Sequence, residues 1–202
     1  MTAKGDSTTP WKLVAYRTPA APSTARVSAW RTLHRMGALY LGPTVCLLPA
    51  QLADAGQLEA LGRRVEAAGG AFEVLAIEAF GDAAEAAVRA RCNEARDAEY
   101  AEIVERAQAL VDELEREGAR GKFTFAEVEE NEADLAKLRR WLGRVTARDL
   151  FGAPSRGPAE DAVGEAERRL TAFVEQAIAR EAEATGAATP EREQAGLRVV
   201  RP

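Results

Sequence analysis

Residues 11–49 constrain the fold most, because a strand pattern, a helix pattern and a hairpin pattern follow one another there. The segment WKLVAYRT is rich in β-forming residues and ends just before a proline, which predicts a strand over 11–18. The segment after it predicts a helix, because Ser23 or Thr24 provides a capping oxygen and Gly37 follows the last helical turn.

Three further elements complete this unit. Short apolar runs at 38–41 and 44–48 flank a Gly-Pro pair, which predicts a β-hairpin. Residues 50–68 have the apolar spacing of a second helix, and residues 71–80 alternate as a strand does. This order within about 70 residues predicts a ferredoxin-like βαββαβ sheet.

The apolar residues of these elements indicate which faces are buried. Val27, Trp30 and Leu33 recur at three-residue spacing, and we expect them to point inward. The strands at 44–48 and 71–80 are apolar on both faces, whereas two helices cover only one face of such a sheet. We therefore expect downstream helices or a second subunit to cover the other face.

The rest of the chain has a helical period. A long helix is expected from residue 82 to about residue 117, followed by a helix that opens with a Thr124-x-x-Glu127 capping box and by a third helix over 158–184. The fold class is therefore α+β: a ferredoxin-like βαββαβ unit, then a long-helix hairpin and a third helix. The expected organisation is a flexible N-terminus (1–10), a ferredoxin-like domain (11–80), an α-helical region (81–184) and a disordered tail (185–202).

Positive charge is concentrated near the N-terminus. The first 50 residues contain six Lys or Arg against one Asp, whereas the whole chain has a net charge of −5. Arg17, Arg26, Arg31 and Arg35 gather around the first strand-to-helix junction. Guanidinium groups bind phosphates and other oxyanions through paired donors, and a helix N-terminus adds exposed N–H groups. These four arginines are the expected anion- or DNA-binding site, and ion pairing with acidic residues of the C-terminal helices is the alternative.

A second cluster lies on the long helix. Arg96, Glu99 and Tyr100 fall within one turn of one another, so they form a polar site or, alternatively, ordinary ion pairs. The two cysteines, Cys46 and Cys92, have no CxxC spacing, and the chain has a single histidine. We therefore expect buried thiols, no metal site and no catalytic residues.

The sequence gives no sign of a membrane segment. No apolar run approaches the ~20 residues that span a bilayer, and the start MTAKGDSTTP lacks the hydrophobic region of a signal peptide. A cytoplasmic location and no membrane partner are expected.

Several separated blocks together resemble a known family. They are YRTP, the arginine-bearing helix and VCLLP in the first 50 residues, then NEARDAEY (93–100), GKFTFAE and RRWL, and finally RDLFG (148–152). In this order they resemble the N-terminal domain of the chromate resistance protein ChrB. The resemblance implies a cytoplasmic, chromate-responsive transcriptional regulator or sensor with chromate or another oxyanion as ligand and no other cofactor.

The resemblance also bears on partners. The sequence shows no counterpart of the second, C-terminal domain of full-length ChrB and no helix-turn-helix of its own. The partners we expect are therefore DNA, a second copy in a homodimer, and a separate protein that carries the C-terminal domain.

Two alternative functions stay open at this stage. The βαββαβ half also resembles the small ferredoxin-like nucleases of CRISPR adaptation, in which an acidic residue at the end of the first strand helps to bind metal. Arg17 occupies that position here, and a cation disfavours Mg²⁺. The same enzyme alternative includes a chromate reductase, which would need a bound flavin or reactive thiols. The second alternative is a non-catalytic, dimerising interaction module. No catalytic motif is present, so we expect a protein that is not an enzyme.

Overall fold

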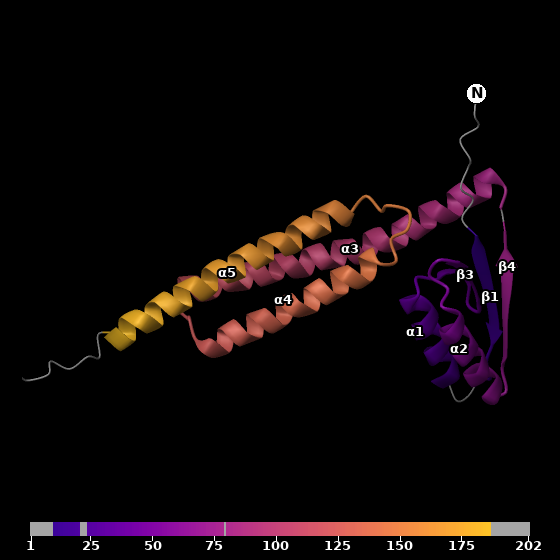
Figure 1. Ribbon diagram of the computed structural model, residues 1–202, viewed down its shortest axis with the longest axis horizontal. Helices are drawn as coiled ribbons and strands as arrows, with labels where there is room; N and C mark the ends of the chain where they lie inside the picture. The colour runs from indigo at the N-terminus through magenta and orange to yellow at the C-terminus, as the bar shows by residue number, and fades with distance from the viewer. Residues whose placement is uncertain (1–9, 21–23, 79, 187–202) are drawn as a thin grey trace, which may run out of the picture. The chain divides into compact units, whose positions relative to one another are not determined.

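The computed structural model describes residues 10–20, 24–78 and 80–186 (Figure 1). They fall into two compact units, which we call the sheet unit (Met1–Ala101 and Gly143–Arg156) and the helical unit (Glu102–Leu142 and Gly157–Pro202). The expected flexible N-terminus (1–10), except Pro10, lies outside the described residues. Of the expected tail (185–202), only residues 185 and 186 are described, and they end the last helix. Folding of residues 11–80 as a separate domain stays a prediction.

The sheet unit contains the predicted βαββαβ arrangement. Its elements are β1 (Trp11–Arg17), α1 (Thr24–Arg35), β2 (Leu39–Gly42), β3 (Val45–Pro49), α2 (Ala55–Ala67) and β4 (Ala71–Ile77). The strand order is β2-β3-β1-β4, and every neighbouring pair is antiparallel. The α+β fold class and the ferredoxin-like order are thus confirmed, with strand ends that differ by at most three residues from the sequence prediction.

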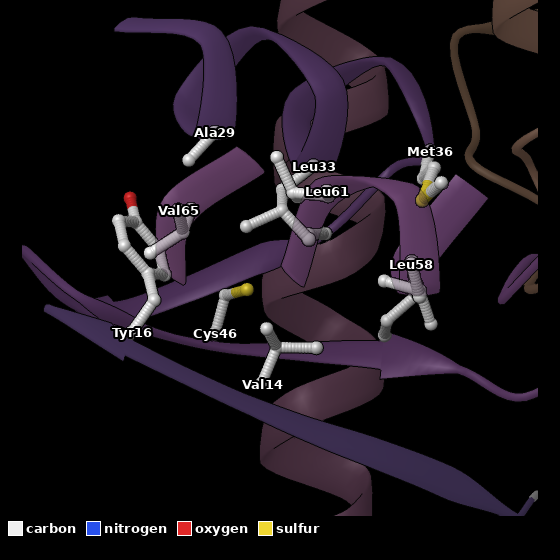
Figure 2. Close-up of a cluster of buried hydrophobic side chains, with 11 residues drawn as sticks. Val14, Tyr16, Ala29, Leu33, Met36, Cys46, Leu58, Leu61 and Val65 are labelled. Atoms are coloured by element: carbon white, nitrogen blue, oxygen red, sulfur yellow. The ribbon is translucent and has the colours of Figure 1, made fainter. Parts of the chain in front are cut away.

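The core of the sheet unit lies between the sheet and its two helices. Figure 2 shows Val14, Tyr16 and Cys46 directed from the sheet toward side chains of α1 and α2, among them Leu33 and Leu61. All five are at most 5% exposed. Fully burying each aliphatic side chain stabilises the fold by about 1.5–3 kcal/mol, so this layer holds both helices on one face of the sheet.

The expected inward face of α1 was partly wrong. Leu33 is buried, but Val27 is 38% and Trp30 50% exposed. Instead the helix buries Ala29, Thr32 and Leu33. At 100° per residue the buried side is centred near Ala29, whereas Trp30 and Val27 lie about 100° and 160° around the helix from it.

The second helix begins later than predicted. Residues 50–53 form a turn, and Asp54 caps α2 because its Oδ1 accepts a hydrogen bond from the Gln57 N–H at 2.7 Å. At the other end a Cβ on Gly70 would lie 2.3 Å from the Arg17 carbonyl oxygen. Glycine therefore lets the turn between α2 and β4 approach β1 closely.

The opposite sheet face is covered in part by downstream residues of the same unit. Trp11, which is 1% exposed, stacks on Phe151 at 5.6 Å between ring centroids and contacts Phe80 at 5.9 Å. On the same face, nearer the edge, Leu75 is 54% exposed. Residues downstream of the βαββαβ unit thus cover the Trp11 end of this face. The sequence analysis had expected either downstream helices or a second subunit to do so.

Long helices make up the helical unit. They are the distal part of α3 (Asp82–Ala119), most of α4 (Phe125–Thr146) and most of α5 (Arg156–Gly186), and Figure 1 shows α3 and α4 side by side as a hairpin. Thr124 Oγ1 accepts from the Glu127 N–H at 3.3 Å, as the predicted capping box requires. Buried Asn131 donates to Glu117 Oε2 at 2.9 Å, which fixes the register of α3 against α4.

Candidate functional site

The exposed side of α1 presents a basic surface with an aromatic residue at its centre. It forms an open hollow of about 630 Å³. We call this surface the α1 face; it is lined by Thr24, Val27, Ser28, Trp30, Arg31, Thr32, His34, Arg35 and, from α2, Arg64. No carboxylate is among these residues, so the α1 face is electropositive.

Contacts within α1 orient the side chains of this face. Arg35 Nε donates to the Arg31 carbonyl oxygen at 3.3 Å, and another nitrogen of the same guanidinium lies 3.5 Å from Thr32 Oγ1. Trp30 and His34 stack with 5.2 Å between ring centroids and 16° between their planes. The indole is therefore held in place although it is half exposed.

The structure brings together two of the four predicted arginines and adds a third that the sequence analysis missed. Arg31 and Arg35 line the α1 face, and Arg64 joins them from α2. Arg26 is exposed at the start of α1, about 140° around the helix from Arg31, and Arg17 is exposed at the end of β1. Neither Arg17 nor Arg26 lines this face.

Within the described part of the sheet unit, none of the four predicted arginines is engaged in an ion pair. Among its described residues, no carboxylate oxygen lies within 4.0 Å of the guanidinium nitrogens of Arg17, Arg26, Arg31 or Arg35. The predicted alternative, pairing with acidic residues of the C-terminal helices, concerns the helical unit and stays a prediction. Among the described residues of the sheet unit, these arginines therefore have no carboxylate partner.

The second predicted cluster is a buried network. Glu99 bridges two arginines: its Oε1 lies 2.7 Å from a nitrogen of Arg96 and its Oε2 lies 2.6 Å from a nitrogen of Arg148. The next residue, Tyr100, donates its hydroxyl hydrogen to Asp149 Oδ2 at 3.2 Å. The Tyr100 side chain is fully buried. The three predicted residues therefore lie together, with Arg148 and Asp149 as partners that the sequence analysis missed.

This network connects three segments of the sheet unit. Arg148 donates to the His34 carbonyl oxygen at 3.2 Å, close to the C-terminal end of α1, and to the Arg144 carbonyl oxygen at 2.9 Å. Asp149 Oδ1 accepts from the Ala153 N–H at 2.9 Å. The network thus holds α1, α3 and residues 143–156 against one another, which is a structural role.

A small cavity lies beside the network. Its volume is about 20 Å³, and its lining includes Cys92, Asn93, Arg96 and Asp149. Arg96 Nε and Asn93 Oδ1 are buried and have no hydrogen-bond partner. A cavity of this volume is large enough for one water molecule. The charges of the network already balance, so a dianion would be costly here.

Neither cysteine has the surroundings of a reactive thiol. Burial raises the pKa of Cys46 to about 12. Burial also raises the pKa of Cys92, although Arg96 and Arg91 oppose the shift. Both thiols are therefore protonated at neutral pH, and thiolate chemistry is disfavoured.

Comparison with known proteins identifies the family. A family model described as "Protein ChrB, N-terminal" matches residues 26–184. The chain belongs to the ChrB N-terminal family. Searches among curated proteins and among solved structures found no match. Membership relates the chain to chromate resistance, as the resemblance of its separated motifs had indicated.

The match places most of the site residues inside the family domain. Residues 26–184 contain the whole buried network and all but Thr24 of the α1 face, whereas Arg17 precedes the matched region. Among the described residues, no three His, Cys, Asp or Glu side chains are grouped so that they could hold a metal ion. In the same part of the chain, none of the helices combines the length and apolar character needed to cross a bilayer.

Proposed function

We propose that this member of the ChrB N-terminal family is a chromate-responsive transcriptional regulator or sensor, and that its α1 face binds the phosphate backbone of DNA. The observation that carries the proposal is the convergence of Arg31, Arg35 and Arg64 on one open surface without a lining carboxylate. The proposal is for a cytoplasmic binding protein, not an enzyme. A protein that carries the ChrB C-terminal domain is a further proposed partner.

The shape of the α1 face favours an extended polyanion. Exposed guanidinium groups attract DNA phosphates at short range, and their binding releases counterions from the DNA. Dissolved salt screens this attraction, so the affinity falls as the salt concentration rises. Such contacts position a duplex without reading its sequence. The exposed indole of Trp30 adds a flat apolar surface beside the charges, and a hollow of about 630 Å³ is wide for a single tetrahedral anion.

DNA binding should depend on the α1 arginines. The double variant Arg31→Gln/Arg35→Gln should weaken binding to a duplex from the protein's own upstream region by roughly tenfold. The slope of log affinity against log salt should become shallower by about 2, because two phosphate contacts are removed. Fluorescence anisotropy titrations at several salt concentrations measure both quantities.

The matched control is Arg106→Gln/Arg140→Gln, which removes the same charge from two exposed arginines of the helical unit. It should leave both affinity and salt slope close to those of the unaltered protein. Equal losses in the two double variants would mean that net charge alone attracts the DNA, and would contradict a specific role of the α1 face.

An oxyanion is the second candidate ligand of the same surface, because paired guanidinium donors also suit a tetrahedral dianion. Isothermal titration with chromate should give a binding heat that persists in Arg17→Ala and disappears in Arg31→Gln/Arg35→Gln. Sulfate, which has the same shape and charge, tests whether the site distinguishes chromate. Heat that persists in the double variant would place the anion elsewhere, and no heat in the unaltered protein would exclude the oxyanion.

A further inference from the structure

The two edges of the sheet differ in how they are protected from pairing with another strand. β2 has only four residues, its register with β3 shifts between Tyr40 and Gly42, and Pro43 follows directly. In addition, the Tyr40 carbonyl oxygen accepts a hydrogen bond from Arg91 of α3 at 3.0 Å. Short length, irregular register, proline and a covering side chain are the means by which proteins block an edge strand.

The other edge, β4, has none of these features. It is seven residues long and pairs with β1 over its whole length without a register shift. Its sequence AFEVLAI contains one charged residue, Glu73, and no proline or lysine. Val74 is 39% and Leu75 is 54% exposed. Among the described residues, β4 pairs with β1 alone, so its outer edge is open to a further strand.

A groove runs beside this open edge. Its volume is about 440 Å³, and it lies between α2 and β4 with Leu58, Gly62, Phe72 and Val74 in its lining. A Cβ on Gly62 would lie 3.0 Å from the Phe72 ring, so glycine lets that ring lie close against α2. The groove offers apolar contacts to side chains of a strand added at β4.

We infer that β4 pairs antiparallel with β4 of a second copy of this chain, forming a continuous eight-stranded sheet. A two-fold axis at Val74 places Phe72 opposite Ala76 and Glu73 opposite Leu75 of the partner strand. Large side chains then face smaller ones in the first pair, and no carboxylate faces another. This self-complementarity favours a second copy over an unrelated strand, since the same surface serves both partners.

The α2 helices complement this pairing. Exposed Glu59 and Arg63 line the groove on each copy and lie 3.9 Å apart within one chain. Lys12 and Glu66 also line the groove, so its charged residues are two of each sign. A second copy therefore meets no excess of its own charge there.

Sedimentation velocity over a range of concentrations tests the inference on the full chain. The unaltered protein should show a reversible monomer–dimer equilibrium, and Val74→Lys or Leu75→Lys should weaken dimerisation about tenfold or more, because like charges then meet near the two-fold axis. Leu41→Lys is the matched control, since Leu41 is 46% exposed on the blocked edge strand β2. Circular dichroism should show that all three variants remain folded.

Cross-linking gives a second measurement that does not depend on weakening the dimer. With oxidised glutathione as oxidant, two Val74→Cys chains should form an intermolecular disulfide, because residues opposite each other on the axis are within disulfide distance. Leu41→Cys should not cross-link efficiently. A protein that stays monomeric at every concentration, or one whose dimer is weakened equally by Leu41→Lys and Leu75→Lys, would overturn the inference. If the protein is monomeric and hydrogen exchange shows the β4 amides protected equally at every protein concentration, the helical unit, not a second copy, covers the edge.

Discussion

Replacing Trp11 by alanine should lower the free energy of unfolding of the sheet unit by about 3–5 kcal/mol. Trp11 is 1% exposed, stacks on Phe151 and contacts Phe80 with tilted rings. Its removal leaves a cavity between the first strand and the 143–156 segment and also removes two aromatic contacts. Urea unfolding followed by circular dichroism measures the change.

Two variants separate this packing effect from other causes. Trp11→Phe should cost only about 1 kcal/mol, because the ring contact is largely kept and the indole N–H, which is buried without a partner, is removed. Trp30→Ala should change stability by about 0.5 kcal/mol or less, because Trp30 is half exposed on α1. If Trp11→Ala costs no more than Trp30→Ala, the second sheet face is not held by this stack.

The contrast between Trp11 and Trp30 shows which parts of the fold can be predicted from sequence patterns. Alternation and turn residues predicted the strands and their order, because both are encoded by adjacent residues. Which side of α1 is buried depends instead on how closely the helix approaches the sheet. Small Ala29 and half-polar Thr32 occupy the buried side, so the three-residue spacing of Val27, Trp30 and Leu33 placed Trp30 inward incorrectly.

The residues of the candidate site also fall into two groups: those that local sequence spacing could predict and those that only the tertiary fold brings in. Arg31 and Arg35 were predicted together with Arg17 and Arg26 around the strand-to-helix junction, and they share one face because they are one helical turn apart. Arg64 joins them only because α1 and α2 lie next to each other on the sheet. Arg148 reaches Glu99 from 49 residues away, and no local spacing encodes that contact. The RDLFG block in which Arg148 lies was noted only as part of the family resemblance.

Replacing Glu99 by alanine should lower the free energy of unfolding by about 3 kcal/mol, because it leaves two buried guanidinium groups without their shared carboxylate. The side chains of Arg96 and Arg148 are only 7% and 11% exposed, so water does not replace the lost partner fully. For a chain of this size the melting temperature should fall by roughly 6–12 °C. Thermal and urea unfolding monitored by circular dichroism measure both values.

Glu94→Ala is the matched control, because Glu94 is exposed on the same helix and the same side chain is shortened. It should change stability by about 0.5 kcal/mol or less. In a double-mutant cycle, Glu99→Ala and Arg148→Ala should be strongly non-additive, since each removes the same ion pair. Additive losses, or equal effects of Glu99→Ala and Glu94→Ala, would show that the bridge does not hold α3 to the 143–156 segment. Because Arg148 also donates to the His34 carbonyl oxygen, the same result would mean that the bridge does not hold the end of α1 either.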